Sequence, residues 1–182
     1  MNSTIHLITR LLLTYCLLWG TFIHTYPQNR NADPGSTYPT PDRLFHIARS
    51  LNRNLVCYDA NQTNGKLDTK EPINVYWLNR EKEPGKTNGL SFIQKKMAYG
   101  YKVVSQTEQT CTITLTAYPE RELTVCWEKD HFVCHIKIND RQAILQSLYV
   151  KASPNNPLHV EYVELQGITA DTGVPVTERI SK

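Results

Sequence analysis

The stretch CTITLTAY, residues 111–118, alternates apolar and polar side chains over its whole length. A period of two places successive side chains on opposite faces of a β-sheet. The alternation continues to Gly167, broken only by short turn sequences. Several such strands in succession predict an antiparallel meander that closes into a β-barrel or curves into a β-sandwich. The expected fold class is therefore all-β with a minor α part.

One short helix is predicted to pack on this sheet, from Ser91 to Tyr99. The sequence SFIQ at residues 91–94 has the pattern of a capping box, in which hydroxyl and amide side chains bond free backbone N–H groups at the helix start. Gly100 is expected to end the helix in the left-handed conformation. Three apolar residues form one stripe that should face the sheet: Leu90, Ile93 and Met97.

Composition and charge exclude some classes of partner. The chain has 182 residues, of which 40% are hydrophobic and 20% charged, so it can bury an ordinary core. The net charge is only +3, and basic residues do not cluster beyond the pair Lys95-Lys96. Nucleic-acid-binding faces usually carry clustered Lys and Arg, so no nucleic-acid partner is expected.

The N-terminal residues differ from the rest. Arg10 precedes the apolar segment Leu11 to Ile23. This segment of about 13 residues is shorter than the ~20 needed to span a bilayer and suits the core of a signal peptide. We therefore expect a signal peptide at residues 1–25, a Pro/Asn-rich linker at 26–42 and one β-rich domain at 43–182. The protein is expected to be exported, periplasmic or secreted, touching a membrane only through an uncleaved signal segment.

Four cysteines follow the predicted signal peptide: Cys57, Cys111, Cys126 and Cys134. An exported chain with an even number of cysteines permits disulfides. Cys126 and Cys134 could face each other across a hairpin centred on Asp130, which makes a disulfide between them possible. Cys111 and Cys134 lie on the apolar faces of their strands, which favours buried thiols instead.

Two segments invite a metal hypothesis, and neither fits well. The loop from Asp59 to Glu71 places Ala60 and Gln62 where a calcium loop needs its first ligands, so a hairpin turning at Asn64-Gly65 is the preferred interpretation. A zinc site would draw on four residues: Cys126, His131, Cys134 and His135. Their spacing matches no usual structural zinc site, and adjacent strand residues point to opposite faces. No metal and no cofactor is expected.

No nucleophile motif is present, so no sequence pattern indicates a catalytic function. Any catalytic residues are unknown. If a ligand site exists, six residues that combine aromatic faces with fixed positive charge are predicted to form it: Trp77, Arg80, Lys86, Tyr99, Tyr118 and Arg121. This mixture suits anionic or sugar ligands. The alternative is that Arg80 and Lys86 are solvated loop charges while Trp77 and Tyr99 belong to the core.

Five segments in order carry a resemblance to a known family: VCYDAN (56–61), VYWLNR (75–80), IQKKMAYG (93–100), LTAY (115–118) and VEYVELQG (160–167). The chain resembles a bacterial family of exported single-domain proteins, domain of unknown function 4833, from about Arg43 to Ile180. The resemblance implies an envelope or secreted location. It brings no activity, ligand or catalytic residue.

Three functions remain open. The first is a non-catalytic module of the cell envelope that binds a small molecule, a glycan or an envelope protein. The second is an enzyme that processes an envelope polymer, with catalytic residues drawn from distant strands. Two or more acidic residues, or a His–acid pair, in one pocket would favour it. The third is a structural or assembly protein, whose sign would be an exposed strand edge or apolar patch.

Overall fold

The computed structural model describes residues 40–181. Their strands are β1 (Arg43–Arg49), β2 (Asn52–Ala60), β3 (Gln62–Thr63), β4 (Lys66–Leu67), β5 (Ile73–Leu78), β6 (Thr87–Gly89), β7 (Tyr101–Gln106), β8 (Thr110–Leu115), β9 (Tyr118–Glu128), β10 (His131–Ile138), β11 (Arg141–Ser153), β12 (Asn156–Thr169) and β13 (Pro175–Ser181). The helix α2 (Phe92–Gln94) continues into the π-helical turn η2 (Lys95–Tyr99). The predicted signal peptide and the linker up to residue 39 lie outside the described residues.

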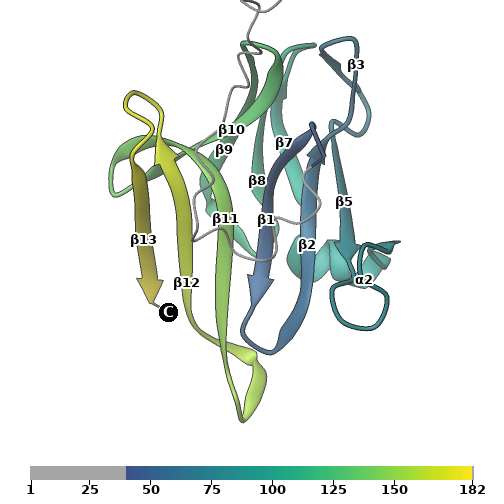
Figure 1. Ribbon diagram of the computed structural model, residues 1–182, viewed down its shortest axis with the longest axis vertical. Helices are drawn as coiled ribbons and strands as arrows, with labels where there is room; N and C mark the ends of the chain where they lie inside the picture. Colours follow the sequence, from purple (N-terminus) through teal and green to yellow (C-terminus); the bar gives the residue numbers. More distant parts are fainter. Residues whose placement is uncertain (1–39, 182) are drawn as a thin grey trace, which may run out of the picture. The chain divides into compact units, whose positions relative to one another are not determined.

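The main sheet has the order β6-β5-β2-β1-β11-β10-β9-β8-β7, and β12 and β13 are attached through β11. Among the described strands, β1 and β11 pair in parallel, while every other pair is antiparallel. The sheet curls strongly on itself (Figure 1). This confirms the expected all-β fold with one short helix.

The long strand β11 contacts three partners. Its first part, Arg141–Ile144, pairs with β10, and the segment Ser147–Val150 pairs with β1. Its other edge pairs with β12 along almost its full length, with a register shift between Leu145 and Ser147. This β-bulge lies where β11 exchanges β10 for β1, and bulges bend a strand and increase its twist. Two arms of the sheet, β1-β2-β5-β6 and β10-β9-β8-β7, therefore diverge from β11.

The core lies between these two arms. Phe45 and Tyr58 from the first arm are fully buried and stack with their ring centroids 4.3 Å apart. Phe132 from the second arm is buried and meets Trp127 edge-on, with a centroid distance of 4.9 Å. The Tyr58 hydroxyl donates to the carbonyl oxygen of Tyr99 at 2.8 Å, so this buried polar group is satisfied.

The alternation that predicts the fold is present in the core. Cys111, Ile113 and Leu115 of β8 are buried, while the threonines between them are half-buried on the other face. Residues 44–49, which could also suit a helix, form β1, and residues 143–151 form part of β11 as expected. The turn predicted at Asn139-Asp140 joins β10 to β11, with positive φ at both residues, as a type I′ hairpin requires.

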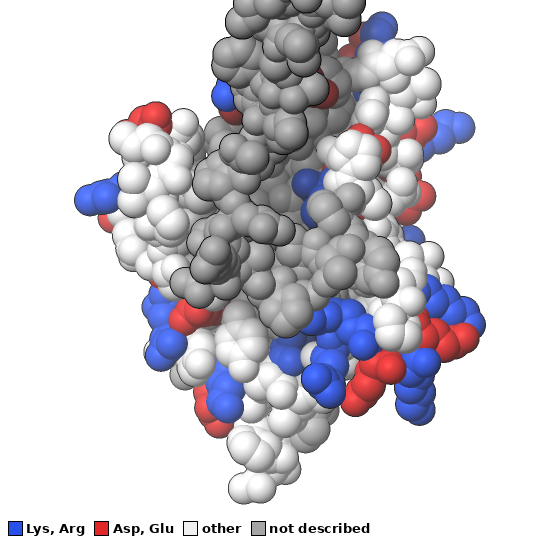
Figure 2. All heavy atoms as spheres, viewed as in Figure 1, with Lys and Arg blue, Asp and Glu red and all other residues white. Residues whose placement is uncertain are grey.

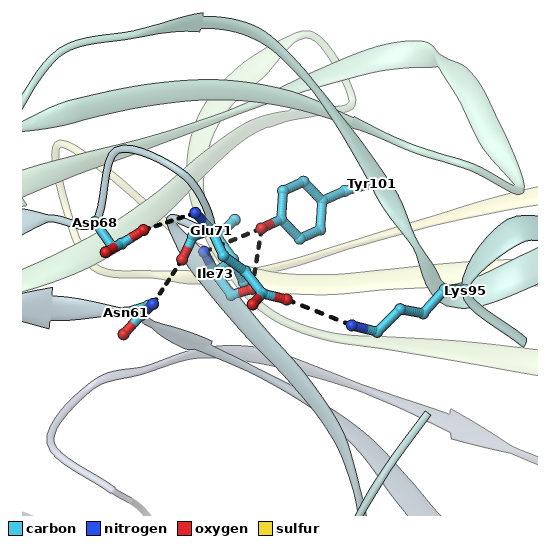
Figure 3. A network of polar contacts seen from close by, with 6 residues as sticks. All are labelled: Asn61, Asp68, Glu71, Ile73, Lys95 and Tyr101. Carbon is cyan, nitrogen blue, oxygen red and sulfur yellow. Dashed lines mark hydrogen bonds and ion pairs between the residues drawn. The ribbon is translucent and has the colours of Figure 1, made fainter. Parts of the chain in front are cut away.

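Side-chain bonds close the far ends of the two arms. The Tyr101 hydroxyl on β7 bonds both the backbone N–H and the carbonyl oxygen of Ile73 on β5, at 3.2 and 3.0 Å (Figure 3). Asp68 accepts from the backbone N–H of Glu71, and Asn61 donates to the Glu71 carbonyl oxygen. The Glu71 carboxylate in turn pairs with Lys95 at 3.4 Å. These contacts hold the loop before β5 against the second arm.

The loop after β2 is the hairpin that its turn sequence predicts. β3 and β4 pair across Asn64 and Gly65, whose φ angles are 54° and 74°. Both values are positive, as in a type I′ turn. The acidic side chain of Asp68 is bonded to backbone N–H groups of this loop. The Asp68 carboxylate, which lies in the loop considered for calcium, thus orders the backbone of that loop.

Two residues that precede β1, Thr40 and Asp42, bond to the end of β2. The Thr40 hydroxyl donates to Asp59 at 2.8 Å, and the Asp42 carbonyl oxygen accepts from the backbone of Ala60 at 2.8 Å. Asp59 also forms an ion pair with Arg43 and accepts from the Tyr76 hydroxyl at 2.6 Å. This buried carboxylate therefore fixes the entry of the chain into β1, because a buried charge needs partners.

The helix confirms one prediction and corrects two. The capping box forms, with reciprocal bonds between Ser91 and Gln94. The stripe prediction is wrong for Ile93 and Met97, which are 66% and 74% exposed. The physical reason is the π turn, whose i→i+5 bonding changes the angular spacing of side chains from that of an α-helix. Tyr99 is turned inward instead and is 8% exposed.

The prediction of a left-handed cap at Gly100 is also wrong. Gly100 has φ −72° and ψ 175°, an extended conformation open to any residue. Its N–H donates to the Lys95 carbonyl oxygen at 2.9 Å, which closes the π turn. A Cβ atom at residue 100 would collide with that same carbonyl oxygen. Glycine is therefore needed here for close approach of backbone rather than for a positive φ.

A substitution at Gly167 tests the close approach of β12 to β11 at the bulge. A Cβ atom at this residue would collide with the carbonyl oxygen of Ile144, beside the bulge. Replacing a glycine by alanine can stabilise a protein because it lowers the conformational entropy of the unfolded chain. At Gly167 the colliding atom belongs to the backbone, which cannot move aside as a flexible side chain can. We expect Gly167→Ala to lower the free energy of unfolding by about 1–3 kcal/mol in urea titrations.

The matched control is Gly89→Ala, because a Cβ atom at Gly89 meets nothing within 4 Å. Its free energy of unfolding should stay within about 0.5 kcal/mol of the wild-type value. Equal midpoints for Gly167→Ala and wild type would contradict the proposed close approach.

Candidate functional site

An open cleft with a volume of about 960 Å³ lies along β9 and β10 and reaches the β12–β13 turn and β13. Its lining is dominated by polar and charged side chains. Four carboxylates line it, namely Glu120, Glu122, Asp140 and Glu178. Two permanent cations, Arg121 and Lys137, line it as well, together with His135, Thr124, Asn139 and Gln142. Carboxylates therefore outnumber permanent cations by four to two.

An ion pair ties β9 to β13 within this cleft. Arg121 donates two hydrogen bonds to the carboxylate of Glu178, at 2.8 and 2.9 Å, and a third to the carbonyl oxygen of Lys137. The backbone N–H of Asn139 also donates to Glu178, at 2.8 Å. The bond from Arg121 lowers the pKa of Glu178 below its ordinary value, because it favours the charged carboxylate. Bidentate geometry of this kind also fixes orientation.

A second group of side chains lies on the outer face of β9 and β10. Along β9, alternation sends Val125 to the core and Cys126 and Glu128 to the opposite face. On β10, His135 lies opposite Thr124 of β9 in the pairing register. The two-residue connection between the strands sets this register and brings the three polar side chains together.

Cys126, Glu128 and His135 place their ligand-type atoms within 4.8 Å of one another. His135 Nε2 lies 2.5 Å from Glu128 Oε1, and Cys126 Sγ lies 3.9 Å from the same oxygen. Burial, and next the nearby charge of Glu128, raise the pKa of the Cys126 thiol above its ordinary value. Of the three residues, His135 also lines the cleft, whereas Cys126 and Glu128 do not.

Sequence reasoning considered Cys126 and His135 for zinc but did not include Glu128. Glu128 is the last residue of β9, directly before the two-residue connection to β10. The available signal was the i, i+2 spacing of Cys126 and Glu128, which puts both on one face of a strand. The objection to Cys134 holds, since Cys134 is fully buried on the core face while His135 is not.

The possible disulfide between Cys126 and Cys134 is not formed and is corrected here. Cys126 lies opposite Val133 on the outer face, whereas Cys134 points into the core opposite Val125. Side chains on opposite faces of a sheet cannot form the short Cβ–Cβ distance of a disulfide. The four described cysteines are free thiols. Cys111 and Cys134 are fully buried, as their strand faces predict.

Four of the six residues predicted as a ligand site form two separate pairs. Trp77 and Tyr99 meet edge-on with a centroid distance of 5.3 Å, and the Tyr99 hydroxyl accepts from Arg49 at 3.1 Å. Arg121 lies over the Tyr118 ring, with its Cζ atom 5.8 Å from the ring centroid. Tyr99 is buried, which agrees with the alternative interpretation that it belongs to the core.

The remaining two residues lie on the loop after β5. Lys86 is exposed and pairs with Glu83 at 2.8 Å, and the Arg80 backbone N–H donates to Asn54. Of the six residues, only Arg121 lines the cleft, and only Tyr118 lines a smaller apolar cavity inside the sheet. Ligand binding by these residues stays a prediction, but neither cavity brings the six together.

The surface near α2 mixes charges and apolar groups. On the described part of the face in Figure 2, acidic and basic side chains lie side by side at the lower right, over the loop between β5 and β6. Phe92 on α2 is 77% exposed, and Lys96 Nζ lies 5.9 Å from its ring centroid.

Within residues 40–181, no helix has the length and apolar character required to cross a membrane.

Fold and site together define a curled β-domain with a polar cleft on one arm of its sheet. Over residues 45–179 the chain matches the family model described as Domain of unknown function (DUF4833). The match covers most of the chain, so the chain belongs to this family, and the resemblance seen in the sequence is confirmed to that extent. Neither a curated protein nor a solved structure matches it.

The Arg121–Glu178 ion pair predicts a pH-dependent contribution to stability. Because the pKa of Glu178 is lowered in the folded state, the pair stabilises the fold above the ordinary Glu pKa of about 4.3 and loses this effect as the pH falls through the folded-state pKa. We expect Glu178→Gln to lower the free energy of unfolding at neutral pH by about 1 kcal/mol. The difference from wild type should shrink as the pH falls below about 4.

Urea titrations at several pH values measure both quantities. Glu81→Gln, on the exposed loop after β5, makes the same charge change and should show no such pH-dependent difference. A constant difference between Glu178→Gln and wild type from neutral to acidic pH would contradict the role assigned to the ion pair.

Proposed function

We propose that this chain is an exported bacterial domain that binds a hydroxyl-rich ligand of the cell envelope, such as a glycan fragment, in the cleft along β9 and β10. The observation that carries the proposal is the lining of this cleft by carboxylate, amide and hydroxyl groups on paired strands. Such groups accept and donate the hydrogen bonds that sugar hydroxyls require.

The size and charge of the cleft support this ligand class. Small-molecule sites occupy about 300–1,000 Å³, and the cleft volume of about 960 Å³ lies at the upper end of that range. Four carboxylates against two permanent cations disfavour a strongly anionic ligand, because like charges repel. Of the anionic and sugar ligands that the six-residue prediction left open, the cleft therefore supports a sugar.

Export is proposed from the sequence. Arg10 and the apolar segment Leu11 to Ile23 have the order of a signal peptide. Cys57, Cys111 and Cys134 are fully buried, so these thiols are protected from oxidation in an exported protein. Cell fractionation with antibody detection tests the location, and recovery of the protein in the cytoplasmic fraction would contradict it.

Binding can be measured by isothermal calorimetry with soluble peptidoglycan fragments and neutral oligosaccharides as probes. We expect at least one probe to bind, and Glu122→Gln and Gln142→Ala each to weaken that binding about tenfold, the effect of losing about 1.4 kcal/mol of hydrogen bonding. Lys102→Ala, an exposed residue on β7 away from the cleft lining, is the matched control and should bind as wild type does. Equal affinities of Glu122→Gln and Lys102→Ala would place the ligand elsewhere.

A second candidate function is an enzyme that processes an envelope polymer. The observation that favours it is the His135–Glu128 pair, with Nε2 and Oε1 2.5 Å apart, at the wall of the cleft. A carboxylate that orients an imidazole is a common arrangement for general acid–base chemistry.

The enzyme hypothesis predicts products. Incubation with the same fragments, followed by mass spectrometry, should show cleavage that His135→Gln abolishes and His131→Gln preserves. His131 lies on the same hairpin but pairs with Asp130 in an exposed position, which makes it the matched control. Fragments that bind and stay intact would rule out this activity for them and leave the binding function.

A further inference from the structure

We propose that Cys126, Glu128 and His135 form a binding site for a divalent transition-metal ion of the zinc type. The three residues come from the hairpin β9–β10 and point to its outer face. The proposal does not depend on the cleft ligand, because the metal would be held by protein side chains alone. It also departs from the expectation, drawn from the sequence, that no metal is bound.

All three ligand atoms lie within 4.8 Å of one another, and the two distances that involve Glu128 can be compared with those of a metal site. Around a tetrahedral zinc ion, with bonds of about 2.0–2.3 Å, neighbouring ligand atoms lie about 3.4–3.6 Å apart. Cys126 Sγ lies 3.9 Å from Glu128 Oε1, and His135 Nε2 lies 2.5 Å from that oxygen. One distance must shorten slightly and the other must open by about 1 Å to admit the ion.

Of the three side chains, that of Glu128 is the best placed to move. Glu128 is the last residue of β9, and its side chain is 42% exposed. His135 is 18% exposed and lies within the paired part of β10, and Cys126 is half-buried within β9. Two ligands are therefore held by the sheet, and the third is a flexible carboxylate at its end.

The chemistry of the three donors selects the type of ion. Thiolate, imidazole and carboxylate are all common zinc ligands. Calcium and magnesium take oxygen ligands, so a site built on sulfur and nitrogen does not suit them. Three protein ligands leave a fourth tetrahedral position for water or for an atom of a bound molecule. Because His135 also lines the cleft, a metal here would lie at the cleft wall.

Both neighbours hydrogen-bond the same Glu128 carboxylate oxygen: His135 Nε2 lies 2.5 Å from it, and the Cys126 thiol donates to it at 3.9 Å. Among the described residues, this is the group of Cys, His and acidic side chains with its ligand atoms close enough to hold one ion.

Cobalt(II) and zinc(II) are suitable probes. We expect the purified full chain, after treatment with a chelator, to take up one Co²⁺ per chain, with a thiolate-to-cobalt charge-transfer band and the visible bands of a tetrahedral site. Zinc should displace the cobalt. Cys126→Ser should remove the charge-transfer band, and Cys126→Ser and His135→Gln should each weaken zinc binding by at least about tenfold, as loss of even an outer partner of a metal ligand does.

Two controls make the outcome decisive. His131→Gln, on the same hairpin but outside the cluster, should bind both ions as wild type does. Near-ultraviolet circular dichroism confirms that each variant is folded. Cobalt uptake without a charge-transfer band, or equal zinc affinity in Cys126→Ser and wild type, would overturn the proposal and show adventitious binding only. The titrations contain no organic ligand, so their failure leaves the proposed cleft function untouched, and failure of sugar binding leaves the metal site untouched.

Discussion

The fold depends on the pairing of one strand, β11, with three others. On one edge it exchanges β10 for β1 within a few residues, and on the other it holds β12. The exchange requires a bend, which the bulge between Leu145 and Ser147 supplies, and a close approach of β12, which Gly167 permits. This junction sets the direction of the two arms of the sheet, so that they face each other and enclose a core.

The candidate site follows from the same junction. Among the described strands, β13 joins the sheet only through β12, and β12 joins the remaining strands only through β11. The curl of this part of the sheet brings Glu178 on β13 to Arg121 on β9, 57 residues apart in the chain. The cleft between them therefore belongs to the tertiary arrangement, while its walls are ordinary paired strands. Groups held on paired strands keep their positions, which is what a binding site needs.

The two faces of the hairpin β9–β10 have different roles. One face contributes Val125, Phe132 and Cys134 to the core. The other presents Cys126 and His135 to the surroundings of the cleft. Strand alternation makes this division possible without any further feature of the backbone, because successive side chains point to opposite sides. A stable core and a polar outer surface are thus encoded in the same short segment of chain.

Local chemistry in the sequence was enough to predict several features. The period of two predicted the strands and the buried faces of Cys111 and Cys134, Asn64-Gly65 predicted a hairpin turn, and the Ser91–Gln94 pattern predicted the capping box. Each depends on residues close together in the chain, whose conformational preferences act before any distant contact forms.

Distant pairing decided the rest. The helix and the π turn that follows it bury Tyr99 and leave Ile93 and Met97 exposed. The register of β9 against β10 added Glu128 to Cys126 and His135 and separated Cys126 from Cys134. The sequence by itself determined which residues form strands and which faces are apolar. Only the tertiary structure decided which strands become neighbours, because partner choice depends on the bend of β11 and the curl of the whole sheet, which no short segment encodes.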